Sequence, residues 1–289
     1  GIRKFVSLDY WEVHGTFAAK AGKYNGRWFD EKFVKDKKDV EQKAERLWDQ
    51  NNAETIRTKC QNKPGIVSEE SKPTTEICPL LYDLTSLQRD ANGRFGFSAK
   101  TTLGLAQALY EKHKALTYPR TDSRALPEDY ITTVKESLNS LEKTRYSTFA
   151  KQILKAGWVK PNKRIFNNAK ISDHFAIIPT SLEPKGLNDA EAKLYDLVTK
   201  RFLAIFYPVA EFLVTTRITR VENEPFKTEG KVMVNPGWQT VYGKEAHVEG
   251  ADDSSTLIGV NAGDLVLAEE VKVVTNQTRP PARFNEATL

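Results

Sequence analysis

Long apolar runs and cysteines are scarce in this sequence. No apolar stretch approaches the roughly 20 residues that a membrane-spanning helix needs, and no basic-then-apolar signal stands at the N-terminus. The two cysteines, Cys60 and Cys78, are isolated, so they form neither a disulfide framework nor a zinc-ligand spacing. We therefore expect no membrane association and a reduced, intracellular setting.

Methionine is equally scarce, and the ends of the chain are unusual. Met233 is the only methionine, the chain begins at Gly1, and its last residues, "NEATL", are typical of a helix that is just beginning. We therefore expect a piece of a longer protein.

An excess of charge is also missing. The net charge of +5 and the pI of about 8.9 favour a polyanionic partner only weakly. With 289 residues, 39% hydrophobic and 28% charged, the chain is long enough for two or three globular domains.

The N-terminal part predicts a hairpin followed by a helix. Asn25-Gly26 stands between aromatic residues and is typical of a two-residue hairpin turn. The stretch "KDVEQKAERLWDQ", residues 38–50, predicts a helix because its apolar residues recur at helical spacing: Val40, Ala44, Leu47 and Trp48. The polar stretch "GIVSEESKPTTEICP", residues 65–79, predicts extended chain that leads to a second module.

Helices dominate the middle of the sequence, and strands return after it. Ser98 is a predicted N-cap for one helix, Pro127 suits the first turn of another, and Asn188 with Glu191 resembles a capping box. Predicted strands follow in "EFLVTTRITRVE", "FKTEGKVMVN", "GWQTVYG" and "DLVLAEEVKVV", and "EGADDSS" is read as a loop. The order predicts an α+β multidomain protein with a helical domain inserted into a mainly β one.

The stretch "ALTYPRTDSRALPEDY", residues 115–130, contains a candidate nucleophile. Pro119 forces Tyr118 out of helical geometry, and in an extended segment Arg120 would point to the same side. A phenol has a pKa of about 10 and is a weak nucleophile unless its anion is stabilised. An arginine stays protonated and binds phosphate oxygens, so this pair suits attack on a phosphodiester. The alternative is a strand-end tyrosine, with Arg120 paired to Asp122.

Five ordered stretches resemble one enzyme family. "LTYPRTDSRALP" resembles the active-site segment of type IA DNA topoisomerases, especially their topoisomerase III branch. "DHFAIIPT" matches that family's "H-x-A-I-x-P-T" signature, and "RPPARFNEATL" resembles its "P-P-x-R-F-x-E-A-x-L" segment. "YWEVHGTF" and "DLTSLQRDANGRFGFSAKTTLGLAQALYE" are similar to its early gate strand and to the helix before the nucleophile.

The resemblance implies a role for each candidate site residue. Tyr118 would bond covalently to a 5′ phosphate of single-stranded DNA, and Arg120 would stabilise charge in the transition state. His174 would contact phosphate or assist proton movement, with a structural histidine as the alternative. The supporting candidates are Asp122, which would organise the motif, Thr121 and Ser123, which would donate to phosphate or close an ordinary turn, and Gln88, a weak DNA contact.

The resemblance also implies a fold and a division of the chain. We expect a β-rich gate or hinge domain with an inserted helical, winged-helix-like domain, both part of a toroidal type IA core. The expected parts are a first hinge segment at 1–83, the helical domain at 84–182, a second hinge segment at 183–275 and the start of a single-strand-binding domain at 276–289.

Cofactor and partners follow from the same resemblance. The full-length enzyme would use Mg²⁺ through a Toprim domain, whose acidic cluster cannot be placed in this sequence; Asp252-Asp253 is no substitute. We therefore expect no bound cofactor and no cleavage activity for this piece alone. Single-stranded DNA is the expected partner, a helicase is a candidate partner, and the bacterial cytosol or nucleoid is the expected location.

Two other functions stay open at this stage. A tyrosine recombinase also joins tyrosine to DNA, but through a 3′ phosphate and with a tyrosine near the C-terminus, which fits Tyr118 poorly. A non-catalytic DNA-binding or scaffold module would keep Tyr118 as a structural residue.

Overall fold

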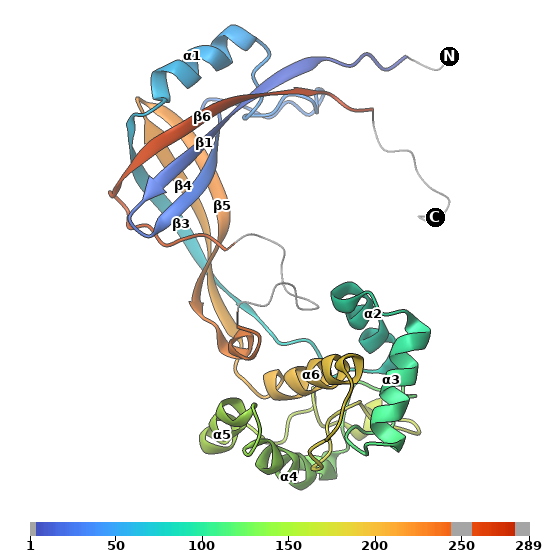
Figure 1. Cartoon of the computed structure of the whole chain (residues 1–289). Helices are drawn as coiled ribbons and strands as arrows, with labels where there is room; N and C mark the ends of the chain where they lie inside the picture. The colour runs from blue at the N-terminus through green and yellow to red at the C-terminus, as the bar shows by residue number, and fades with distance from the viewer. Residues whose placement is uncertain (1–3, 244–255, 281–289) are drawn as a thin grey trace. The chain divides into compact units, whose positions relative to one another are not determined.

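The computed structural model describes residues 4–243 and 256–280 and forms two compact units. One unit comprises Gly1–Thr74, Phe212–Met233 and Ser254–Leu289, and the other comprises Thr75–Glu211 and Val234–Asp253. The first unit contains strands and helix α1, Gln50–Cys60, and the second unit is mainly helical (Figure 1). The domain boundaries that we expected at residues 83, 182 and 275 come from the family resemblance, whereas these two units are defined by their compactness. The expected boundaries therefore stay a prediction.

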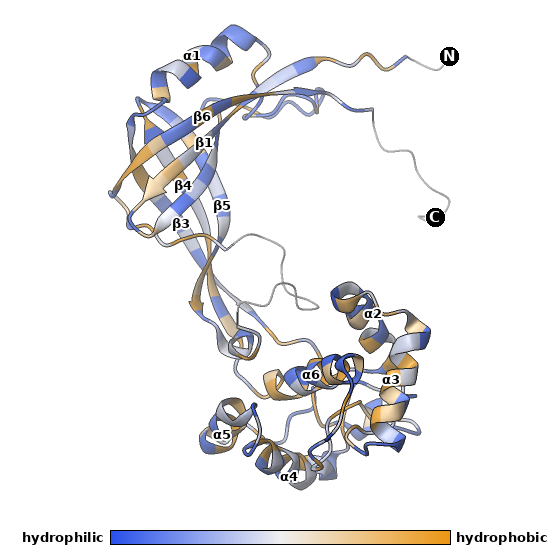
Figure 2. Ribbon diagram, in the orientation of Figure 1, coloured by the Kyte–Doolittle hydropathy of each residue, from blue (hydrophilic) through white to orange (hydrophobic). Residues whose placement is uncertain are grey.

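The strand unit is a closed barrel with the strand order β1-β2-β5-β4-β3-β6. The bounds of its strands are β1 Asp9–Ala19, β2 Gly22–Trp28, β3 Pro64–Glu76, β4 Ala210–Val221, β5 Glu224–Asn235 and β6 Leu265–Gln277. Buried and more exposed residues alternate along β4, as strand geometry requires when one face is covered. Figure 2 shows the corresponding mixture of apolar and polar residues along the barrel strands.

The barrel interior combines an apolar cluster with an ion pair of a buried arginine. Phe17 packs on Tyr24 and Phe226, and helix α1, Gln50–Cys60, adds its buried residues to the same cluster. Arg217 is fully buried, and its Nε lies 2.5 Å from Glu69 Oε1. The guanidinium also lies over the Tyr24 ring, 4.5 Å from its centroid.

The described residues of the helical unit form five α-helices. Their bounds are α2 Leu84–Phe95, α3 Ala99–Glu111, α4 Ile131–Leu141, α5 Ser147–Ala156 and α6 Asp189–Ala204. The predicted caps are confirmed: Ser98 accepts a hydrogen bond from Thr101 N, and Asn188 with Glu191 forms a capping box. Pro127 precedes a 3₁₀ turn, Glu128–Tyr130, that leads into α4.

The predicted hairpin turn is in the wrong place. Asn25 and Gly26 lie inside β2, where they pair with Thr16 and Gly15, and the chain reverses before Gly22. A Cβ on Gly26 would lie only 3.0 Å from the Phe17 ring. Gly26 is therefore explained by close packing across the barrel rather than by a turn.

The predicted helix at residues 38–50 is also wrong. Val40 is 71% exposed, and Leu47 exchanges two backbone hydrogen bonds with Trp11, at 2.7 and 2.8 Å. The Arg46 guanidinium lies over the Tyr10 ring. This contact with β1 replaces helical hydrogen bonding, and the helix begins only after Asp49, which caps α1.

"GWQTVYG" forms a 3₁₀ helix, Gly237–Val241, rather than the predicted strand. Gly237 has φ +50°, and a Cβ there would lie 2.2 Å from the carbonyl oxygen of Val209. Trp238 is fully buried, and its indole N–H donates to Glu76 O at 2.8 Å. Tertiary packing of this tryptophan therefore fixes the segment. The predicted "EGADDSS" loop, Asp252-Asp253 and the "NEATL" helix lie outside the described residues.

Candidate active site

Tyr118 is positioned by two segments that pair in antiparallel fashion. Thr117 N donates to Ile178 O at 3.0 Å, and Thr180 N donates to Ala115 O at 2.9 Å. Between them, Leu116 forms a β-bridge with Pro179. This pairing places the end of one segment, at Tyr118, beside the start of the other.

The Tyr118 ring contacts two other aromatic rings. Its centroid is 4.3 Å from that of His174 and 5.3 Å from that of Tyr110, the latter in an edge-to-face arrangement. Tyr118 is half-buried and His174 is exposed. No hydrogen bond to the Tyr118 hydroxyl is found within residues 4–243 and 256–280. The ring is thus held in place while its hydroxyl stays free to react.

A cavity of about 660 Å³ opens beside this tyrosine. Its lining residues are Tyr110, Glu111, Lys114, Leu116, Thr117, Tyr118, Phe175 and Thr180. They come from the end of α3, the segment after it and the 173–180 segment. Tyr118 therefore faces a space that a ligand can enter.

Arg120 and Asp122 are both exposed and make no ion pair with each other. Thr121 N donates to Pro119 O at 3.0 Å, so a tight turn is centred on Arg120. The chain is not extended here, and the same-side relationship expected for Tyr118 and Arg120 does not follow from strand geometry. Among the described residues, the Arg120 guanidinium has no hydrogen-bonding or ionic partner.

Thr121 and Ser123 are buried and bonded within the protein. Ser123 N donates to the Thr121 hydroxyl at 3.1 Å, and the Ser123 hydroxyl donates to Lys170 O at 2.8 Å. Leu84 N donates to Thr121 O at 3.0 Å, which fixes the turn against the start of α2. These contacts agree with the alternative that Thr121 and Ser123 close an ordinary turn. Their role as hydrogen-bond donors to phosphate stays a prediction.

Gln88 lies on α2, and its side chain donates to Ala99 O at 3.0 Å. It therefore connects α2 to the first turn of α3. No contact between Gln88 and the aromatic cluster at Tyr118 is found in the part of the chain that the structure describes. Its role as a DNA contact stays a prediction.

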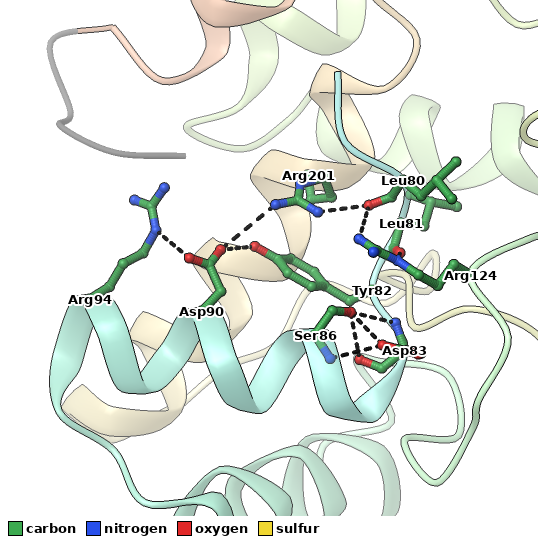
Figure 3. A network of polar contacts seen from close by, with 9 residues as sticks. All are labelled: Leu80, Leu81, Tyr82, Asp83, Ser86, Asp90, Arg94, Arg124 and Arg201. Atoms are coloured by element: carbon green, nitrogen blue, oxygen red, sulfur yellow. Dashed lines mark hydrogen bonds and ion pairs between the residues drawn. The ribbon is translucent and has the colours of Figure 1, made fainter. Parts of the chain in front are cut away.

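Figure 3 shows a polar network around Tyr82, Asp90 and Arg201 that sequence reasoning missed. Asp90 accepts a hydrogen bond from the Tyr82 hydroxyl and forms an ion pair with Arg94, at 3.2 Å. The fully buried Arg201 lies 3.7 Å from Asp90 and 4.2 Å from the centroid of the Tyr82 ring. Burial raises the pKa of Tyr82 well above its ordinary value, so its hydroxyl remains a donor.

Arg124 joins this network to the Tyr118 turn. Its Nε donates to Leu81 O at 2.7 Å, and one Nη donates to Leu80 O at 3.0 Å. Arg201 donates to the same Leu80 oxygen at 2.7 Å. In the sequence, Arg124 is visible only as a second arginine in the candidate stretch. Its position there does not reveal that it binds the carbonyl oxygens of Leu80 and Leu81.

The described residues contain no group of three or more His, Cys, Asp or Glu that could hold a metal ion. In the same part of the chain, no helix is both long and apolar enough to cross a membrane.

The comparisons with known proteins agree with one another. A family model described as "DNA topoisomerase" matches residues 1–289. DNA topoisomerase 3 of Bacillus subtilis is 43% identical over 257 residues, which cover 87% of this chain and 35% of that protein. DNA topoisomerase 3 of Shouchella clausii is 38% identical over 292 residues, which cover 100% of this chain and 38% of that protein. The chain thus spans little more than a third of these relatives.

Among solved structures, full-length topoisomerase I from Thermotoga maritima has a similar fold. The TM-score is 0.59 at 20% sequence identity, and the match covers 99% of this chain and 43% of that one. At this identity the likeness concerns the fold.

Proposed function

The chain belongs to the DNA topoisomerase family, in its type IA class, and on that premise we propose that Tyr118 is the nucleophile of a longer enzyme. This enzyme cleaves single-stranded DNA transiently, passes DNA through the gap and reseals it without ATP. The observation that carries the proposal is the position of Tyr118: half-buried between His174 and Tyr110, and open to a cavity.

The proposed reaction is an exchange of phosphodiester bonds. The Tyr118 oxygen attacks the phosphorus and loses its proton, a bond forms between them, and the bond from phosphorus to the 3′ oxygen breaks. The released 3′ oxygen takes up a proton, and the DNA stays attached through its 5′ phosphate. Because the new bond is also a phosphate ester, the reverse reaction needs no nucleotide.

Arg120 and His174 are the proposed assistants. The exposed Arg120 guanidinium has no protein partner among the described residues, so it is available to phosphate oxygens as negative charge develops. His174 lies against the Tyr118 ring and is exposed, so it can contact the phosphate or carry a proton. We assign Asp122 a supporting role in organising the motif. Thr121, Ser123 and Gln88 are secondary candidates for contacts with DNA.

The finer features of the family remain part of the proposal. They are a winged-helix-like character of the helical unit, a place for both units in a toroidal core, and a preference for decatenation over bulk relaxation. Mg²⁺ would be held by a Toprim domain of the longer protein, in the bacterial cytosol or nucleoid. Single-stranded DNA is the proposed partner and a helicase a further candidate. Incubating the 289-residue chain with DNA and Mg²⁺ tests whether it is inactive alone.

The test compares the full-length protein with its Tyr118→Phe variant on supercoiled DNA and on end-labelled single strands. We expect the wild type to relax DNA and to block the 5′ end of the downstream cleavage product. We expect the variant to do neither. A blocked 3′ end would support a tyrosine recombinase, and full strand passage by the variant would support a scaffold.

A further inference from the structure

The cavity beside Tyr118 contains groups that the proposed cleavage does not use. Tyr110, Glu111, Lys114 and Phe175 contribute to its wall together with Tyr118. All come from the helical unit: from the end of α3, from the segment after it and from the 173–180 segment. Figure 1 shows α3 within this unit.

We propose that this cavity binds the base of the nucleotide that stays attached to Tyr118 after cleavage. This is the first nucleotide on the 3′ side of the broken bond. The inference rests on the proposed function, because it requires a 5′ phosphate on Tyr118. It adds a specific binding subsite for one nucleotide of the substrate.

Covalent geometry brings this nucleotide to the cavity. Its 5′ phosphate is bonded to the Tyr118 oxygen, so its base is tethered near Tyr118 through one deoxyribose. Tyr118 itself forms part of the cavity wall, and the volume of about 660 Å³ falls within the range of pockets that hold small ligands. The position and the volume of the cavity therefore suit the base of this nucleotide.

The aromatic residues of the wall suit a base. Tyr110 meets Tyr118 edge to face, with an interplanar angle of 78°, and remains 36% exposed. Phe175 is half-buried and packs against Tyr130, at a centroid distance of 4.9 Å. Bases stack on such rings whatever their sequence, because each base has a π-face.

The charged residues of the cavity wall favour a base inside the cavity and a phosphate outside it. The Glu111 carboxylate would repel a phosphate, but it accepts hydrogen bonds, as it already does from Gln107 at 2.8 Å. Lys114 is exposed in a left-handed conformation, φ +51°, and its carbonyl oxygen accepts a hydrogen bond from the Thr180 hydroxyl at 2.7 Å. Because the Lys114 side chain is exposed, its ammonium group is available to the DNA backbone.

The test uses the full-length protein and two single-stranded oligonucleotides. One is intact, and the other has an abasic site at the first position 3′ of the cleaved bond. For the wild type we expect the abasic site to lower the equilibrium amount of covalent adduct by about fivefold to a hundredfold. For Tyr110→Ala we expect both oligonucleotides to give the same low level, whereas Tyr110→Phe should behave as the wild type.

Two further variants separate subsite binding from structural damage. Phe175→Leu keeps an apolar side chain without the ring, and we expect it to reduce the abasic effect even if Tyr110→Ala does not fold. Lys114→Ala should weaken DNA binding and reduce its salt dependence by about one ion. Lys112→Ala is the matched control, because Lys112 is an exposed lysine that is not part of the cavity wall. This variant should change neither DNA binding nor its salt dependence.

The outcomes also separate this inference from the proposed function. No adduct at Tyr118 with any oligonucleotide would overturn the proposed function. An adduct that forms equally well with the abasic oligonucleotide, or an abasic effect of full size in Tyr110→Ala and Phe175→Leu, would overturn only the base subsite.

Discussion

Tyr118 and His174 lie ring against ring, with their centroids 4.3 Å apart and their planes inclined by 39°. The two residues are far apart in the sequence, and the pairing of residues 115–117 with 178–180 brings them together. Because His174 is exposed and Tyr118 is only half-buried, the pair contributes little to a hydrophobic core. The contact agrees with the proposal that both residues take part in the cleavage reaction.

Replacing His174 distinguishes that role from a structural one. We expect His174→Ala in the full-length protein to slow DNA cleavage by roughly a hundredfold or more, as loss of an assisting acid or base does. Its free energy of unfolding should change by no more than about 0.5 kcal/mol, because the side chain is exposed. Single-turnover cleavage and chemical denaturation measure the two quantities. Normal cleavage combined with a large loss of stability would support the structural alternative.

Arg120 should matter for the reaction and not for the fold. We expect Arg120→Ala to reduce the cleavage rate by about a hundredfold to a thousandfold, because a charge-stabilising donor is lost. The melting temperature should stay unchanged, since this guanidinium has no partner among the described residues. Arg220→Ala is the control: it removes an equal charge from an exposed pair with Glu31 in the strand unit. Equal effects of the two variants on cleavage would contradict the assignment.

Ser123 should contribute measurably to stability. Its buried hydroxyl donates to Lys170 O at 2.8 Å, and Ser123→Ala leaves that carbonyl without this donor. We expect a loss of about 1 to 3 kcal/mol in the free energy of unfolding. Ser140→Ala, which removes an exposed hydrogen bond to Ser181 O, should cost less. Weaker DNA binding at unchanged stability would instead support a phosphate-donor role.

The success of sequence reasoning depended on the range of the interactions. The caps at Ser98 and Asn188 were predictable because each uses a backbone group only three residues away. The helix predicted at 38–50 failed because Leu47 pairs with β1, a partner that helical spacing cannot reveal. Gly26 was taken for a turn residue because packing against Phe17 is equally invisible in the sequence.

The candidate site shows the same limit. The motif identified Tyr118, Arg120 and His174 individually, and the family resemblance supplied their expected roles. The ring contact between Tyr118 and His174 depends on long-range pairing. Arg201 was missed because a buried arginine and an exposed one look alike in a helical pattern.

The capping box of α6 predicts a pH dependence of stability. The pKa of Glu191 is lowered from its ordinary value of 4.5, first because its carboxylate accepts the Asn188 N–H and also because it faces His113. A lowered folded-state pKa gives stability that is present above about pH 4.5 and is lost as the pH falls through the folded value. Glu191→Gln should therefore be less stable than the wild type at neutral pH, with a difference that shrinks below pH 4.5.

Denaturation across this pH range measures the difference. Glu136→Gln, at an exposed position on α4, is the matched control. A difference between wild type and Glu191→Gln that stays constant through acid pH would contradict the assignment.

Direct mapping of the covalent bond tests the central claim. Full-length protein is trapped on single-stranded DNA, digested with protease and nuclease, and analysed by mass spectrometry. The account predicts that the DNA-linked peptide carries its modification on Tyr118, through a 5′ phosphate, and that Tyr118→Phe yields no such peptide. A bond at another residue, or a 3′ phosphate on Tyr118, would contradict it.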